Sequence, residues 1–159
     1  MKKDWLFSDE HSICSYRTSG VLIRNNKILV QREKDGREYA LPGGHVIIGE
    51  TSEQSLIREY KEETGADIIC TRMIWIEETF WKWKEKKAHT IAFYYLISLI
   101  NESDIPDNYF ESHKDNCNVM LEWMEIDKIN DLTIYPQFIK EKINNIFDNN
   151  IEHFICYDY

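Results

Sequence analysis

The stretch LPGGHVIIGETSEQSLIREYKEETGA, residues 41–66, decides the fold of this chain. Thr51 and Gln54 have the spacing of a capping box, in which a hydroxyl begins a helix and a Gln or Glu three positions later completes the cap. Gly65 stands where a helix commonly ends in the left-handed conformation. The pattern therefore predicts a helix over residues 52–64.

Gly43 and Gly44 precede this helix in a segment that we read as a loop. Glycine adopts positive φ readily and lets another group approach the backbone closely. The glycine pair therefore predicts a flexible loop at the start of the helical unit.

At about 100° per residue, the predicted helix has two neighbouring faces. The residues of its apolar face are Leu56, Ile57, Tyr60 and Thr64. The second face is acidic and contains what we call the carboxylate cluster, Glu59, Glu62 and Glu63. Side chains three or four positions apart have Cβ atoms only about 5–6 Å from each other, so these carboxylates repel one another unless a cation lies between them. The alternative is a solvated acidic surface.

The spacing of the whole stretch favours the cation. It follows the pattern G-x5-E-x7-R-E-U-x-E-E-x-G-U, where U is a bulky apolar residue, and resembles the signature of the Nudix hydrolases. The matching positions are Gly44, Glu50, Arg58, Glu59, Tyr60, Glu62, Glu63, Gly65 and Ala66. Every charged and glycine position agrees. Tyr60 and Ala66 depart from the usual aliphatic residues, which concerns packing and not chemistry.

This resemblance implies hydrolysis of a nucleoside diphosphate linked to another group, by attack of water at phosphorus. It also implies Mg²⁺ as the cofactor, with Mn²⁺ as the alternative, because phosphoryl chemistry depends on charge neutralisation and on oxygen-ligated ions. The implied main metal ligands are Glu59 and Glu63, with Glu62 as a third ligand or a ligand through water. Arg58 would orient a carboxylate of the site, and Glu50 would pair with Arg58 or act through a water.

The same resemblance suggests contacts with the substrate. Gly43 and Gly44 would let the backbone reach the phosphates, and His45 could touch one. His89 is open between a sheet residue and a substrate contact. A general base could come from the carboxylate cluster or from outside it, and the outside candidates are Glu78, Glu111 and Glu122. Aromatic side chains that could stack on a base, or pack in the sheet instead, are Phe80, Trp81, Trp83, Tyr109 and Phe110.

Composition sets further limits. A net charge of −9 argues against non-specific binding to nucleic acid. No apolar run is long enough to span a bilayer, and the N-terminus lacks the apolar region of a signal peptide, so we expect a cytoplasmic protein with no membrane partner. The cysteines Cys14, Cys70, Cys117 and Cys156 are widely spaced and read as reduced thiols.

The rest of the chain reads mainly as strands. Residues 20–33 have the pattern of a β-hairpin around Asn25 and Asn26, since asparagine tolerates left-handed turns. The other expected segments are a loose or peripheral segment at 1–12, strands at 67–81, 88–100 and 119–126, a long loop at 101–118, a helix from Pro136 to about 147, and a weakly assignable tail at 150–159.

These segments predict one domain over residues 1–159 with an α+β fold. Periodicity gives a mixed sheet with helices on both faces, and the Nudix resemblance specifies an α/β/α sandwich. The sequence leaves open whether the chain is monomeric or a homodimer.

The substrate also stays open. No proline lies between Pro42 and Pro106, which argues against the ADP-ribose-cleaving and NADH-cleaving members of the family, and the acidic charge argues against mRNA decapping. Nucleoside triphosphates, nucleotide sugars and other small diphosphates remain. The alternative from another class is a nucleotide-sensing module without catalysis. An isoprenoid diphosphate isomerase would need a cysteine near the glycine loop, and none lies between Cys14 and Cys70.

Overall fold

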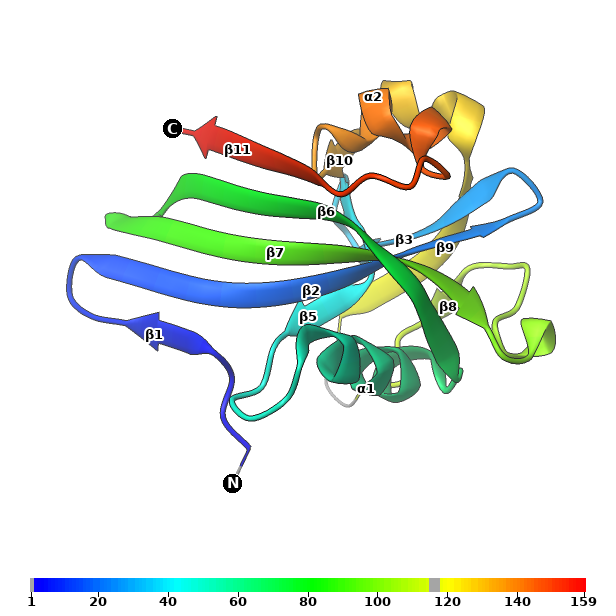
Figure 1. Cartoon of the computed structure of the whole chain (residues 1–159), viewed down its shortest axis with the longest axis horizontal. Helices are drawn as coiled ribbons and strands as arrows, with labels where there is room; N and C mark the ends of the chain where they lie inside the picture. The colour runs from blue at the N-terminus through cyan, green and yellow to red at the C-terminus, as the bar shows by residue number, and fades with distance from the viewer. Residues whose placement is uncertain (1, 115–117) are drawn as a thin grey trace.

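A computed structural model describes residues 2–114 and 118–159 (Figure 1). Its strands are β1 (Leu6–Ser8), β2 (Ser12–Arg24), β3 (Lys27–Glu33), β4 (Glu38–Ala40), β5 (Gly43–His45), β6 (Ile68–Trp83), β7 (Lys86–Leu99), β8 (Phe110–Glu111), β9 (Val119–Glu125), β10 (Thr133–Tyr135) and β11 (Glu152–Asp158). The α-helices are α1 (Ser52–Thr64) and α2 (Ile139–Lys142). Short 3₁₀ turns are η1 (Glu102–Asp104), η2 (Ile126–Asp131) and η3 (Ile143–Asn145).

The strands form a mixed sheet in the order β10-β4-β3-β2-β7-β6-β11. The β2–β7, β6–β11 and β4–β10 pairs are parallel, and the other pairs along this order are antiparallel. The predicted hairpin over residues 20–33 is confirmed, since Asn25 and Asn26 take φ values of 52° and 59° between β2 and β3. The strands expected at 67–81 and 88–100 correspond to β6 and β7, which form a second antiparallel pair with two register shifts.

The core lies on both faces of the sheet because side chains alternate along each strand. Val21 of β2 belongs to one cluster and its neighbour Leu22 to the other. The cluster with Leu22 packs under α1 through Leu56 and Tyr60. The other cluster is covered by α2, η3 and the residues around them (Figure 1). The predicted α+β fold, with a mixed sheet and helices on both faces, is confirmed.

The C-terminal helix prediction was wrong in its extent. Pro136 does not begin a helix, and α2 covers only Ile139–Lys142 before the chain tightens into η3. The apolar residues of this segment nevertheless face the core, since Ile139, Ile143 and Ile146 are all buried. Several asparagines follow, and their side chains compete for backbone hydrogen bonds, which shortens helices.

Both chain ends contain strands that the sequence did not reveal. The peripheral N-terminal segment includes β1, which pairs with β2 through exposed residues. The tail includes β11, which adds to β6 in parallel at one edge of the sheet. Neither strand has a signal of its own in the sequence, because each is stabilised by pairing with a partner strand, β2 for β1 and β6 for β11.

Two further expectations concern thiols and membranes. Cys14, Cys70 and Cys156 are free thiols, as predicted, and Cys117 lies outside the described residues. Among residues 2–114 and 118–159, no helix is long and apolar enough to cross a membrane.

Candidate active site

Helix α1 has the bounds that the sequence predicted. The Thr51 hydroxyl accepts a hydrogen bond from the Gln54 amide at 3.1 Å, and the Thr51 amide donates to Gln54 Oε1 at 2.9 Å, so the capping box is complete. Gly65 ends the helix in the left-handed conformation with φ of 76°. These local signals set both ends of the helix, and the packing of Leu56 and Tyr60 in the core sets the direction of its acidic face.

The carboxylate cluster is mostly buried. Glu59 and Glu63 are 5% and 6% exposed, whereas the side chain of Glu62 is 44% exposed. Buried carboxylates are costly unless a cation or hydrogen bonds compensate them. The two buried members are the residues to which the sequence assigned the main metal ligation, and Glu62 lies at the rim.

The glycine loop prediction was wrong, because Gly43–His45 forms strand β5. A Cβ added to Gly44 would lie 2.4–2.7 Å from the carboxyl atoms of Glu59, and one added to Gly43 would lie 2.1 Å from the Thr18 carbonyl oxygen. Van der Waals contact needs more than 3 Å. The glycines therefore serve close packing, with Gly44 giving the Glu59 carboxylate its place against the sheet.

Arg58 holds the cluster from one side. Its Nη1 donates to Glu59 Oε1 at 2.8 Å and lies 3.3 Å from Glu62 Oε2. Its Nε donates to Glu50 Oε2 at 3.0 Å, so the predicted ion pair between Glu50 and Arg58 is present. Arg58 Nη2 also donates to the His45 carbonyl at 3.4 Å. This four-way contact orients the Glu59 carboxylate and ties helix α1 to strand β5.

Glu50 stays ionised in this network. Burial disfavours its charged form, but hydrogen bonds from Arg58, Lys2 and Ser55 outweigh burial and lower its pKa to about 2. Glu50 therefore acts as a fixed negative partner for Arg58.

Glu63 has the opposite environment. Burial, and then the neighbouring Glu59 charge, raise the pKa of Glu63 to about 7. Its Oε2 is buried and has no hydrogen-bond partner among the described residues. An orphaned carboxylate oxygen beside two other carboxylates is a donor set suited to a divalent cation with oxygen ligands.

A protein cation already lies in this cluster. Lys114, from the segment between β8 and β9, places Nζ 3.0 Å from Glu59 Oε2 and 3.7 Å from Glu62 Oε2. In this arrangement, in which Arg58 and Lys114 bond to the carboxylates, no group of three His, Cys, Asp or Glu residues among those described is placed to hold a metal ion. No sequence pattern marks Lys114 as a site residue, because a single lysine in a polar loop carries no signal.

The residues proposed as a general base outside the cluster are engaged elsewhere. Glu78 lies 3.0 Å from His153 Nε2 and 3.6 Å from His89 Nε2. Glu111 pairs with Lys34 at 2.5 Å, and Glu122 pairs with Arg32 at 2.8 Å. Within the part of the chain that the structure describes, none of these three glutamates pairs with a residue of the carboxylate cluster.

His45 and His89 have different surroundings. His45 Nε2 lies 3.5 Å from Nη1 of Arg17, a residue that the sequence did not single out, and burial followed by the Arg17 charge lowers the pKa of His45. His89 stacks on Phe80 at 4.2 Å between ring centroids. The structure therefore brings His45 close to the acidic helix and leaves His89 in a sheet contact.

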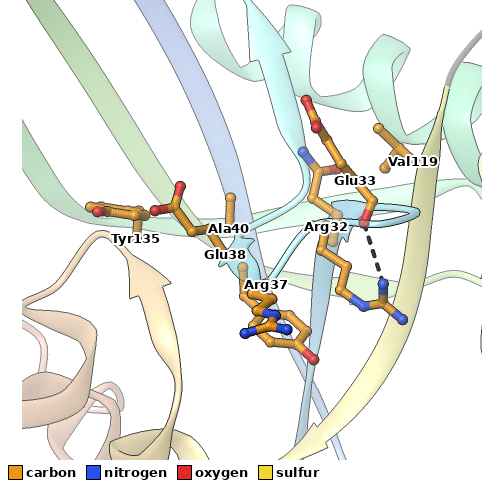
Figure 2. Close-up of a pocket in the computed structure, with 10 residues that line it drawn as sticks. Arg32, Glu33, Arg37, Glu38, Ala40, Val119 and Tyr135 are labelled. Atoms are coloured by element: carbon orange, nitrogen blue, oxygen red, sulfur yellow. Dashed lines mark hydrogen bonds between the residues drawn. The ribbon is translucent and has the colours of Figure 1, made fainter.

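A groove runs along the sheet face opposite α1, next to His45. It consists of three adjoining pockets of about 230, 450 and 520 Å³. The first and second share Arg17, Trp81 and Thr90. The third pocket shares Gln31 and Glu38 with the second. Figure 2 shows this third pocket, in which the carboxylate of Glu33 points away from the guanidinium of Arg32. We call these three pockets the substrate groove.

The candidate aromatic residues divide between the two faces of the sheet. Trp81 lines two pockets of the substrate groove and Trp83 lines one. Phe80 stacks on His89 and Tyr157 instead, Phe110 packs against the α1-side core, and Tyr109 is 73% exposed. Strand alternation explains the division, since consecutive residues face opposite sides.

The chain is similar in sequence to known proteins of one family. The family model described as NUDIX domain matches residues 16–143. The chain is similar to an ADP-ribose pyrophosphatase of Methanocaldococcus jannaschii, with 31% identity over 51% of this chain and 48% of that protein. It is also similar to the Nudix hydrolase YvcI of Bacillus subtilis, with 27% identity over 75% of this chain and 71% of that one. The chain thus spans about half the length of the first of these relatives.

Solved structures agree in fold. A MutT protein from Bacillus halodurans superposes with a TM-score of 0.63 at 17% identity, over 86% of this chain and 85% of that one. An ADP-ribose pyrophosphatase from Streptococcus suis gives a TM-score of 0.55 at 16% identity, over 89% and 98% of the two chains. At such identities the likeness concerns the fold alone.

Proposed function

Because the chain belongs to the Nudix family, we propose that it is a pyrophosphohydrolase that uses Mg²⁺, or Mn²⁺ in its place, to cleave a nucleoside diphosphate linked to another group. The proposal includes one catalytic domain over residues 1–159, a cytoplasmic location and a small phosphorylated substrate. It excludes nucleic acid and membrane partners, and it leaves a homodimer open to measurement.

The carboxylate cluster supports this proposal most directly. Glu59 and Glu63 are buried side by side on α1, and Glu63 Oε2 has no hydrogen-bond partner among the described residues. Glu59, Glu62 and Glu63 would hold the divalent ion. When bound, such an ion supplies charge neutralisation and polarisation of the phosphate oxygens.

The remaining residues position these groups. Arg58 fixes one oxygen of Glu59, and Glu50 fixes Arg58. Gly44 gives Glu59 its place against β5. Arg17 and His45 line the first pocket of the substrate groove, and Arg58 of the acidic helix donates to the His45 carbonyl, so we expect Arg17 and His45 to bind the phosphates of the substrate.

The substrate groove would hold the organic part of the substrate, and Trp81 is its best-placed stacking residue. Stacking a base on an aromatic ring contributes about 1–3 kcal/mol. We therefore expect Trp81→Ala to raise KM about tenfold with little change in kcat. Steady-state kinetics on the best substrate measure this effect. Phe80→Ala is the matched control, since Phe80 precedes Trp81 on β6 and faces the other side of the sheet. Equal KM values for the two variants would contradict the assignment of Trp81 as the stacking residue.

The substrate class needs a direct comparison. Two relatives are named as ADP-ribose pyrophosphatases, so ADP-ribose is added to the candidate substrates. The absence of a proline shortly after the acidic helix argues against ADP-ribose. We propose that the substrate is a nucleotide sugar, ADP-ribose or another small nucleoside diphosphate derivative. The mixed charge of the groove, with Arg17 near the acidic helix and Glu38 farther along, suits a two-part molecule with an uncharged far end.

A nucleotide panel tests the proposed function. ADP-ribose, nucleotide sugars and nucleoside triphosphates are incubated with Mg²⁺, with Mn²⁺ or with chelator, and nucleoside monophosphate release is measured by chromatography. We expect release from at least one compound with either metal and none with chelator. Binding of a nucleotide without release under any condition would favour the sensing module instead.

A further inference from the structure

We propose that Lys114 is a built-in competitor of the divalent ion: its ammonium and the metal occupy the same place between Glu59 and Glu62, so that metal binding displaces it. The inference rests on the proposed metal dependence of this site. It concerns a residue that lies outside the acidic helix and its sequence pattern.

The first observation is the position of the ammonium. Lys114 Nζ lies 3.0 Å from Glu59 Oε2 and 3.7 Å from Glu62 Oε2, and it approaches from the side of Glu59 that Arg58 does not use. Arg58 bonds Oε1 of Glu59, and Lys114 bonds the second oxygen of the same carboxylate. A divalent ion between Glu59 Oε2 and Glu62 Oε2 would stand where the ammonium now lies, and repulsion between the two cations disfavours joint occupancy.

The second observation is that the backbone beside Lys114 is fixed. The amide of His113 donates to the Glu63 carbonyl at 2.7 Å, at the C-terminal end of α1. The Lys114 amide lies 3.3 Å from the Ser112 hydroxyl. The lysine stem therefore starts next to the carboxylate cluster, and its contact with Glu59 does not depend on a chance conformation of a remote side chain.

The third observation separates the two cations of the site. Arg58 has partners beyond the cluster, Glu50 and the His45 carbonyl, which keep it in place when a metal arrives. Among the described residues, Lys114 Nζ contacts Glu59 and Glu62 alone, and its side chain is 43% exposed. A flexible, half-exposed lysine can move into solvent at small cost, whereas the guanidinium of Arg58 cannot leave without exposing Glu50.

Charge decides the direction of the effect. With the cluster ionised, three negative groups face two cations, and removal of the Lys114 charge leaves the cluster one unit more negative. Attraction for a divalent ion then increases, and the competitor is lost as well. Lys114→Met, which keeps most of the side-chain length, should therefore bind metal more tightly than the wild type.

The test is a titration of the full chain with Mn²⁺, followed by the electron paramagnetic resonance signal of free Mn²⁺. We expect the Kd of Lys114→Met to be about tenfold lower than that of the wild type, and that of Lys114→Arg to stay within about threefold. The melting temperature in chelator should fall in Lys114→Met, and its rise on adding Mn²⁺ should exceed the rise in the wild type.

Lys61→Met is the matched control. Lys61 lies on α1, the helix of the carboxylate cluster, and pairs with Asp67 at 2.8 Å. Its replacement by Met therefore changes the protein charge by the same amount as Lys114→Met without removing a contact of the cluster. An unchanged or higher Kd in Lys114→Met would overturn the proposal, as would an equal decrease in Lys61→Met. The titration needs no substrate, so its outcome is separate from that of the nucleotide panel, in which a failure of the proposed function would be seen.

Discussion

Glu59→Gln is expected to lower kcat by about 10²–10³-fold while the chain stays folded. The amide keeps the shape of the carboxylate but loses the charge that holds the two protein cations and that would hold the proposed metal. Glu59 is 5% exposed and is held by Arg58 at 2.8 Å and by Lys114 at 3.0 Å. The substitution removes this negative centre without creating a cavity.

The same substitution should also destabilise the protein modestly. Arg58 and Lys114 lose a charged hydrogen-bond partner, which costs about 1–3 kcal/mol of unfolding free energy. Denaturant melts monitored by circular dichroism measure this change, and kinetics on the best substrate measure the loss of turnover. Glu53→Gln, an exposed position in the first turn of α1, serves as the control with near-wild-type values. A Glu59→Gln enzyme with turnover within threefold of the wild type would rule out Glu59 as a metal ligand.

Gly44→Ala is expected to lower activity about 100-fold through geometry alone. The new methyl group would lie 2.4–2.7 Å from the Glu59 carboxyl atoms, so the carboxylate must move by about an ångström. A displacement of that size at a catalytic group can cost about 100-fold in rate. Overpacking of this kind also costs about 1–3 kcal/mol of stability.

A second substitution makes this prediction specific. In the double variant Gly44→Ala with Glu59→Asp, the shorter side chain leaves room for the methyl group, so stability should recover while activity stays low. Gly20→Ala is the matched control, because its added Cβ meets Ile97 Cδ1 at 2.7 Å, so it overpacks the core without touching the Glu59 carboxylate. Full activity in Gly44→Ala would show that catalysis does not depend on the close contact between β5 and the Glu59 carboxylate.

Much of the fold could be predicted from the sequence, and the successes have a common cause. The capping box at Thr51 and the left-handed Gly65 fixed both ends of α1. The Asn25-Asn26 turn fixed the register between β2 and β3. In each case the residues that decide the conformation lie within about four positions of one another, so a local pattern contains the whole cause.

The failures share the opposite cause. The glycines of β5 predict a loop, whereas its strand character comes from pairing with Arg17–Ser19 of β2. The sequence of β11 predicts no element, because this strand forms by addition to β6 at the sheet edge. The apolar residues of 136–147 predict a longer helix than α2, because their spacing reflects burial and does not guarantee a continuous helix.

For the candidate site, the sequence by itself determined the acidic residues and their spacing on one helix, since helical geometry places residues 59, 62 and 63 together without help from the rest of the chain. Only the tertiary structure decided which of them are buried, that Gly44 makes room for Glu59, and that Lys114 and Arg17 join the site. Lys114 and Glu59 are 55 positions apart in the chain. A contact of that range depends on how the whole sheet folds, and no local pattern contains it.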